Sequence, residues 1–136
     1  MDDSVIGALF DAAAKVRTHA HAPYSQFKVG AALVCEDGRI FVGCNVENAA
    51  FPSGTCAEAG AIAAMIAGGG RQIAAMAILG EAATPVTPCG ACRQRISEFA
   101  QHQTRIVAGN TAGLRQSFTM DELLPHAFSL RAEPHA

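Results

Sequence analysis

Half of the 136 residues are hydrophobic, and the formal net charge at pH 7 is −2. This length fits one domain that can bury its own core, so we expect a single domain over residues 1–136, with little to pack the tail after about residue 130. The negative charge excludes the basic footprint of a nucleic-acid-binding protein, and no membrane span is expected because no run of eighteen apolar residues occurs. Five cysteines, behind an acidic start (Met1–Ser4) without the basic region of a signal peptide, predict reduced thiols in the cytoplasm.

The first part of the chain predicts a helix followed by a β-hairpin. Apolar residues at helical spacing, with Ser4 as the N-cap, predict a helix that ends at about His19. Residues 27–35 are almost continuously apolar, which is typical of a buried strand, and residues 40–46 form the return strand. The Asp37-Gly38 pair between them indicates a tight hairpin turn.

The middle of the chain predicts a buried helix and a central strand. The helix begins at about Cys56, with Thr55 as a possible cap, and the three glycines at 68–70 end it. Its residues are small or apolar nearly all round, which predicts burial. Residues 73–79 form an apolar strand that belongs in the centre of a sheet.

The last third predicts a helix from Cys89 to about Ala100, an antiparallel strand pair at 105–108 and 114–118, and a short helix at 120–124. A helix between two strands implies a crossover to a parallel neighbour. The order of helices and strands therefore predicts an α/β fold, namely a three-layer α/β/α sandwich around a mixed five-stranded sheet.

Three cysteines have the spacing of a metal site. Cys89 and Cys92 lie one helical turn apart at a predicted helix start, and Cys56 lies at the start of another helix. The free N–H groups and the dipole of a helix N-terminus stabilise thiolates, and a catalytic zinc ion keeps a fourth position open for water. Glu58 lies two residues after the first ligand, where it can move protons. The set predicts a zinc hydrolase.

Other interpretations of the cysteines stay open. A structural zinc module without catalysis needs a fourth ligand, and Cys35 and Cys44 are candidates, although both fall in predicted strands where a small buried hydrophobe is expected. A redox pair would have no use for Cys56. A cysteine–histidine nucleophile needs a positioned imidazole, but the five histidines lie at predicted helix ends or in the tail.

Cys56-Ala57-Glu58 followed by Pro88-Cys89-Gly90-Ala91-Cys92-Arg93-Gln94 matches the pattern of zinc deaminases, in which a ligand-x-Glu element precedes Pro-Cys-x-x-Cys. With residues 24–33, 43–49 and 122–125, these blocks make the chain resemble the small homotetrameric cytidine deaminases over nearly its whole length. The resemblance implies a zinc ion, a homotetramer with shared active sites, and a small nucleoside as substrate rather than nucleic acid.

The same resemblance assigns roles to individual residues. The three cysteines would bind zinc and Glu58 would be the proton shuttle. The backbone N–H of Ala57 would hold the 2-oxo group of the pyrimidine, and the carbonyl group of Thr87 would accept from its amino group. Asn45 and Glu47, which lie two apart at a predicted strand end, would hydrogen-bond the ribose.

Three phenylalanines complete the pocket that the resemblance implies. Phe27 would line the nucleoside pocket, Phe128 would face the base, and Phe51 would enter from a neighbouring subunit. The reaction implied is hydrolytic deamination of cytidine and deoxycytidine to uridine and deoxyuridine in pyrimidine salvage. Glu58 would pass a proton from water to the ring and then to the leaving amino group.

Ala59 is the one clear departure from the family. The family usually carries arginine at this position, where its charge offsets the three thiolates. Arg93 is a candidate to replace it, as are the amides of the helix N-termini. A related branch that deaminates blasticidin S also lacks this arginine, so a modified cytosine nucleoside or a blasticidin-type antibiotic is the alternative substrate.

Overall fold

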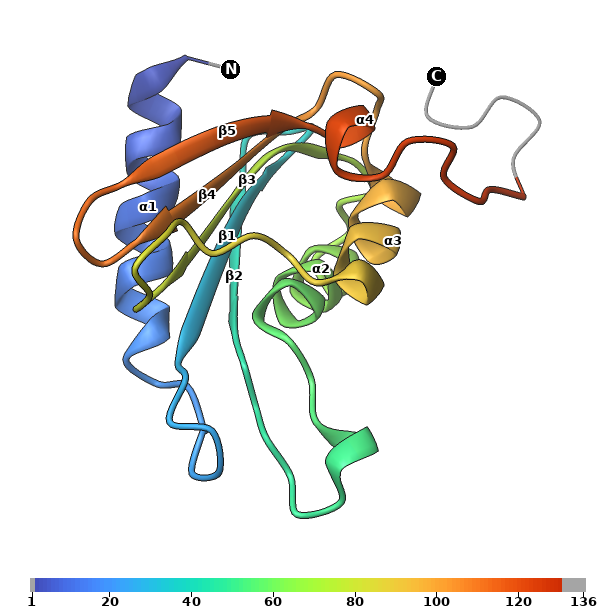
Figure 1. Cartoon of the computed structure of the whole chain (residues 1–136). Helices are drawn as coiled ribbons and strands as arrows, with labels where there is room; N and C mark the ends of the chain where they lie inside the picture. The colour runs from blue at the N-terminus through green and yellow to red at the C-terminus, as the bar shows by residue number, and fades with distance from the viewer. Residues whose placement is uncertain (1, 131–136) are drawn as a thin grey trace.

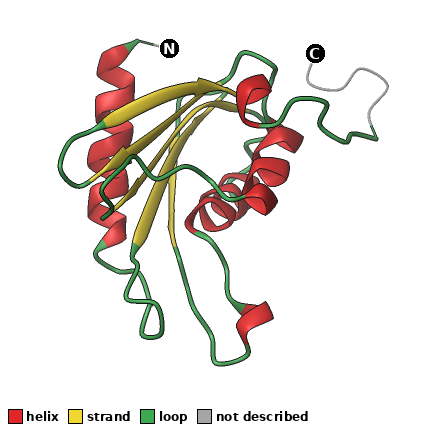
Figure 2. Cartoon of the chain, in the orientation of Figure 1, coloured by secondary structure: helices red, strands yellow, loops and turns green. Residues whose placement is uncertain are grey.

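The computed structural model describes residues 2–130, and the predicted loose tail after about residue 130 lies outside them. The elements in chain order are α1 (Asp3–Arg17), β1 (Val29–Cys35), β2 (Ile40–Cys44), the 3₁₀ turn η1 (Phe51–Ser53), α2 (Ala57–Ala67), β3 (Ile73–Gly80), α3 (Gly90–Phe99), β4 (Arg105–Asn110), β5 (Arg115–Thr119) and α4 (Met120–Leu123). The sheet forms the middle layer, with α1 on one face and α2 and α3 on the other (Figures 1 and 2). The predicted three-layer α/β/α sandwich is confirmed.

The sheet is mixed, as predicted, and its five strands follow the order β2-β1-β3-β4-β5. Strand β1 pairs antiparallel with β2 and with β3, β3 and β4 are parallel, and β4 and β5 are antiparallel. Helix α3 makes the crossover between the two parallel strands. The hairpin turn between β1 and β2 contains Gly38 at φ +90°, a left-handed conformation that glycine adopts at little cost.

Each face of the sheet has its own hydrophobic core. Ile6, Leu9 and Phe10 of α1 pack on one face, and Met65 of α2 and Ile96 of α3 pack on the other. Fully burying a side chain of this size stabilises a fold by roughly 1.5–3 kcal/mol, so both helix layers are held firmly against the strands. No helix within residues 2–130 is long and apolar enough to span a membrane.

The ends of the elements differ from the prediction by one or two residues. Asp2, not Ser4, caps α1, because its carboxylate accepts a hydrogen bond from the N–H of Val5 at 3.0 Å while Ser4 Oγ donates to the same carboxylate. Cys56, not Thr55, is the N-cap of α2. Both corrections follow from local hydrogen bonds and backbone angles that hydrophobic spacing does not determine.

Helix α2 lies unusually close to the backbone of β2. A Cβ atom on Gly43 would be 2.3 Å from the backbone nitrogen of Ala61 and 2.4 Å from the carbonyl oxygen of Ala57, so only glycine fits there. This contact fixes the first turn of α2, together with Cys56 before it, against the sheet. The predicted burial of α2 is correct for the side that faces the strands, whereas Ala63 on the other side is exposed.

Candidate active site

Two helix N-termini meet at a cluster of cysteines. Cys56 is the N-cap of α2, Cys89 is the N-cap of α3, and Cys92 lies in the first turn of α3. The three sulfur atoms lie within 4.8 Å of one another, close enough to converge on one ion. Three thiolates that leave a fourth position for water form a donor set that suits a catalytic zinc ion, so the residues present fit the predicted metal.

The surroundings of the three thiols differ. Burial raises the pKa of Cys56 and of Cys92 above the ordinary value for a thiol. Burial acts in the same direction on Cys89, but hydrogen bonds from the N–H of Cys92 and from the neighbouring thiols outweigh it and lower the pKa of Cys89. Cys89 is therefore the thiol that most readily becomes a thiolate, and a bound cation would favour that form in the other two as well.

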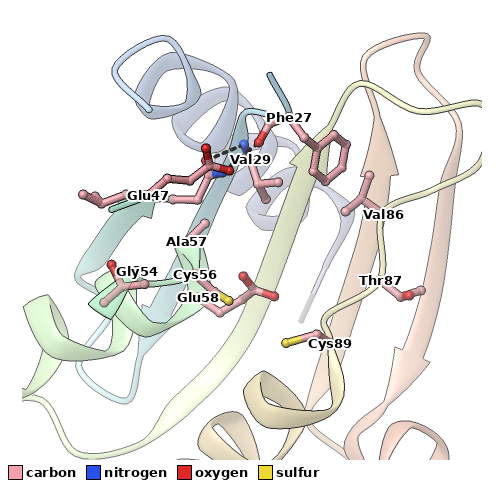
Figure 3. A pocket seen from close by; sticks show the side chains of 13 residues that line it. Phe27, Val29, Glu47, Gly54, Cys56, Ala57, Glu58, Val86, Thr87 and Cys89 are labelled. Atoms are coloured by element: carbon pink, nitrogen blue, oxygen red, sulfur yellow. Dashed lines mark hydrogen bonds between the residues drawn. The ribbon is translucent and has the colours of Figure 1, made fainter. Parts of the chain in front are cut away.

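Glu58, in the first turn of α2, is a buried acid beside this cluster. Its exposed fraction is only 5%, and Figure 3 shows its carboxylate pointing into the cavity near Cys56 and Cys89. Burial raises the pKa of Glu58 above the ordinary value for a glutamate. A raised pKa favours the protonated form of the carboxyl group, which a proton shuttle must adopt in part of its cycle.

A cavity of about 300 Å³ opens over the cysteine cluster. The predicted site residues that line it are Phe27, Asn45, Glu47, Cys56, Ala57, Glu58, Thr87 and Cys89. Sequence reasoning missed five further lining residues, which are Val29, Val46, Gly54, Thr55 and Val86. Phe27 and Val86 approach each other above Gly80 and form an apolar wall (Figure 3). The volume and this wall suit one small molecule with a flat ring.

Comparison with known proteins identifies the family. Residues 4–109 match the family described as the cytidine and deoxycytidylate deaminase zinc-binding region. The chain belongs to this family. The cytidine deaminase of Sporosarcina psychrophila is 44% identical over 115 residues, which are 85% of this chain and 85% of that protein. The cytidine deaminase of Halalkalibacterium halodurans is 41% identical over 89% of this chain and 92% of that protein.

The solved structures agree with this membership. A crystal structure of the cytidine deaminase from Burkholderia pseudomallei matches with a TM-score of 0.87 at 45% identity, and the match covers 94% of this chain and all of that chain. The cytidine deaminase from Mycobacterium tuberculosis matches with a TM-score of 0.82 at 33% identity over 96% of this chain. The predicted family, the α/β fold and zinc as the metal of this family are therefore confirmed.

Asn45, a predicted ribose ligand of this deaminase-family site, bridges the ends of two strands. Its Oδ1 accepts a hydrogen bond from the N–H of Val29 at 2.8 Å, and its Nδ2 donates to the carbonyl oxygen of Phe27 at 2.7 Å. At this point the side chain of Asn45 makes hydrogen bonds where backbone pairing between the two strands was expected. As a result, β1 starts two residues later than predicted and β2 ends two residues earlier. Because Nδ2 carries a second hydrogen and Asn45 lines the cavity, its contact with ribose stays a prediction.

Glu47, the second predicted ribose ligand, holds the loop before β1. Its Oε1 accepts hydrogen bonds from the N–H groups of Tyr24 and Ser25 at 3.0 and 3.1 Å, and its Oε2 accepts one from the hydroxyl group of Ser25. The hydroxyl bond, followed by the two backbone bonds, lowers the pKa of Glu47 below the ordinary value. Glu47 therefore carries its charge at neutral pH at the loop end of the cavity, where its role toward ribose also stays a prediction.

Phe51 and Phe128 lie outside the cavity of their own chain. Phe51, in the turn η1, is 77% exposed and touches Tyr24 edge-on with ring centroids 6.1 Å apart. Phe128 is 69% exposed, and its backbone carbonyl accepts a hydrogen bond from Gln94 Nε2. The predicted entry of Phe51 from a neighbouring subunit and the predicted contact of Phe128 with the base stay predictions.

Among the arginines of residues 2–130, Arg95 is the one that hydrogen-bonds the cysteine cluster. Its Nη1 donates a hydrogen bond to the sulfur of Cys92 at 3.3 Å. Arg93, the predicted candidate, points elsewhere, because its Nε donates to the carbonyl oxygen of Pro88 and its Nη1 to that of Leu123. The spacing of three residues between Cys92 and Arg95 is the signal that sequence reasoning missed, since residues three apart share one face of a helix.

The remaining two cysteines do not join the cluster within residues 2–130. Cys35, at the end of β1, is buried as predicted, and its thiol donates a hydrogen bond to the carboxylate of Asp37 at 2.9 Å. Cys44, at the end of β2, is half-buried, so the prediction of a core position is only partly correct. A structural zinc site that takes either of them as a fourth ligand is disfavoured.

Proposed function

We propose that this protein is a zinc-dependent enzyme that hydrolyses cytidine and deoxycytidine to uridine and deoxyuridine, with release of ammonia. The observation that carries the proposal is the convergence of Cys56, Cys89 and Cys92 at two helix N-termini, where two of the three cysteines and the buried acid Glu58 line one cavity of suitable size. Family membership and the cytidine deaminases among its relatives support the substrate.

The cysteines would hold the zinc ion through three thiolates. When bound there, zinc would supply Lewis-acid activation of the attacking water. The helix N-termini that carry Cys56 and Cys89 stabilise negative charge at both sulfurs. Each ligand is therefore placed by backbone geometry, which needs no rearrangement of long side chains on metal binding.

Glu58 would move the protons of the reaction. Its carboxylate takes a proton from the attacking water and delivers it to N3 of the pyrimidine, which makes C4 electrophilic. After the resulting hydroxide adds to C4, the carboxylate takes the second proton from the new C4 hydroxyl group and gives it to the amino group, so that the C4–N bond breaks, ammonia leaves and the 4-oxo group forms. One group acts first as base and then as acid, and burial, which raises the pKa of Glu58, favours the protonated form that the second role needs.

Backbone groups and an apolar wall would recognise the base. Ala57 is the first residue of α2, so its N–H is one of the unpaired donors of a helix start and can bind the 2-oxo group. Thr87 lines the cavity with its side chain turned away from Glu58 in Figure 3, which leaves its carbonyl group for the amino group. Phe27 supports the face of the ring, and Asn45 and Glu47 lie at the loop end, where the ribose would be held.

We further propose that one domain spans residues 1–136, because both hydrophobic cores lie on a single sheet. The proposed assembly is a homotetramer with shared active sites, and the exposed rings of Phe51 and Phe128 support it, since exposed aromatic side chains commonly enter interfaces. Free cysteines support a location in the reducing cytoplasm. A role in pyrimidine salvage follows from the proposed substrate and product.

Metal analysis combined with an ultraviolet assay tests the proposal. We expect about one zinc ion per chain and turnover of cytidine and deoxycytidine, with activity lost on chelation and restored by zinc. Free cytosine, a modified cytosine nucleoside and blasticidin S belong in the same panel, because Ala59 departs from the family at the metal site. Faster turnover of one of those compounds would replace the proposed substrate, and bound zinc without turnover of any compound would indicate a structural module.

A further inference from the structure

Arg95 is the cationic side chain that hydrogen-bonds a sulfur of the cysteine cluster in the structure. It lies on α3, one turn after Cys92, and its Nη1 is 3.3 Å from the sulfur of that residue. Cys92 itself is fully buried, whereas Arg95 is exposed on the outer side of the helix. The guanidinium group thus covers a buried ligand from the solvent side.

We propose that Arg95 is a positioning residue of the metal site, which strengthens zinc binding by offsetting the negative charge of the three thiolates through Cys92. The inference rests on the proposed zinc enzyme and concerns how this particular chain stabilises its metal. Three thiolates and a divalent cation leave one negative charge, and one guanidinium group cancels it. This neutralisation stabilises the metal-bound state, because a net charge in a partly buried site costs free energy.

The geometry of helix α3 explains why Arg95 performs this role and Arg93 does not. Successive residues of a helix are turned by about 100°, so the residue after Cys92 faces away from it and the third residue returns to the same side. Arg93 is accordingly held by two backbone carbonyl groups, those of Pro88 and Leu123, at 2.9 and 3.0 Å. The chemistry of the donor alone does not distinguish the two arginines, but their direction does.

The small side chain of Ala59 leaves space for this contact. Ala59 of α2 and Arg95 of α3 line the same hollow between the two helices, which Ile62 and Phe99 also line. Ala59 follows Cys56 by three residues, as Arg95 follows Cys92, so both positions face the seam where the thiols meet. Because the side chain of Ala59 is small, the longer side chain of Arg95 has room between the two helices to reach the sulfur of Cys92.

Zinc affinity, measured by competition with a chromophoric chelator on the full-length metal-loaded protein, tests the proposal without any assay of activity. Arg95→Gln keeps a polar but shorter side chain and removes the charge. We expect this variant to bind zinc about tenfold more weakly. This loss is at the low end of the range for groups that contact metal ligands, because Arg95 is exposed. Arg95→Lys should lose less. The difference between the wild type and Arg95→Gln should shrink in 1 M NaCl, since salt screens an exposed charge.

Arg115→Gln is the matched control. It removes the same charge from a residue that packs over the ring of Phe10 on the opposite face of the sheet, with the guanidinium carbon 4.1 Å from the ring centroid. This variant should bind zinc as the wild type does. Equal affinity of Arg95→Gln and wild type would overturn the proposal, and so would an equal, salt-independent loss in Arg95→Gln and Arg95→Lys. A wild-type protein that binds no zinc would instead overturn the proposed function.

Discussion

The cysteine end and the loop end of the cavity are built in different ways. At the cysteine end, Cys56 and Cys89 are helix N-caps and Glu58 lies in a first turn, so the backbone of packed helices places each group. At the loop end, Asn45 and Glu47 follow a strand, and their side chains hold the backbone of the segment before β1. The first end is supported by the cores, and the second depends on single side chains.

Because the two ends are built differently, substitutions at one end should affect metal binding and proton transfer, and substitutions at the other should affect the loop over the cavity. A change at the cysteine end should alter metal binding or proton transfer while the surrounding fold persists, because helices α2 and α3 keep their buried faces. A change at the loop end should loosen the segment over the cavity while leaving the metal in place, because no cysteine depends on it. Substitutions can therefore be ranked by which end they reach.

Removal of a ligand should have the largest effect. Cys89→Ala deletes the thiol with the lowest pKa of the three, and we expect loss of nearly all bound zinc and of activity, together with lower thermal stability. Metal content by mass spectrometry and a melting curve measure both outcomes. Cys35→Ala is the control, since it removes a buried thiol outside the cluster and should keep zinc while losing a little stability. A zinc-replete, fully stable Cys89→Ala protein would contradict the ligand assignment.

Removal of the proton shuttle should have the next largest effect on activity, while zinc should stay bound. Glu58→Gln keeps the shape of a buried side chain but cannot accept and return a proton, so turnover should fall by about 10²–10⁴-fold. Steady-state kinetics and zinc content on the same preparation check the result. Turnover close to that of the wild type would show that another group moves the proton.

A backbone contact that supports the cysteine end should come third. Gly43→Ala places a Cβ 2.3 Å from the backbone of α2, so the helix must shift, and we expect a loss of roughly 1–3 kcal/mol in the free energy of unfolding. Gly7→Ala is the control, because a Cβ there meets nothing within 4 Å and should stabilise α1 by about 0.5–1 kcal/mol. Urea unfolding of both variants measures the difference. A Gly43→Ala protein as stable as the wild type would show that α2 is free to move.

The sequence predicts the cysteine end well because its information is local. Ligand spacing and helix starts suffice to bring Cys56, Cys89 and Cys92 together, and the apolar pattern suffices for the sheet and its flanking helices. The direction of a side chain on its helix is less easily predicted, so Arg93 is a candidate from the sequence, whereas Arg95 makes the contact in the structure.

The loop end was predicted less well because its structure depends on contacts between distant residues. The N–H of Val29 bonds to a side chain sixteen residues further on, a contact that no local pattern encodes, and here β1 starts late and β2 ends early. Phe51 and Phe128 are exposed in the single chain, and no hydrophobic pattern along the sequence tells what covers them. The sequence therefore predicts which residues line this end of the cavity, but not which groups they hydrogen-bond.

The smallest expected effect concerns the charge of Glu47. Hydrogen bonds from Ser25 and Tyr24 lower its pKa in the folded state, so the ionised form stabilises the fold above the unfolded pKa of about 4.5, and this contribution is lost as pH falls through the lower folded value. Glu47→Gln has no such titration. The stability advantage of the wild type over Glu47→Gln should therefore be constant from pH 7 to about pH 5 and shrink toward pH 3.

Urea unfolding of both proteins across this pH range measures the advantage, and hydrogen exchange at the amides of Tyr24 and Ser25 locates it. Glu81→Gln is the control, because the carboxylate of Glu81 is exposed and meets only Arg17, at 3.7 Å, among the recorded ion pairs of residues 2–130. Zinc content should be unchanged in both variants, since neither residue touches the cysteines. An advantage that does not change with pH would mean that shape, not charge, holds the loop, and loss of zinc in Glu47→Gln would show that the two ends of the cavity are coupled.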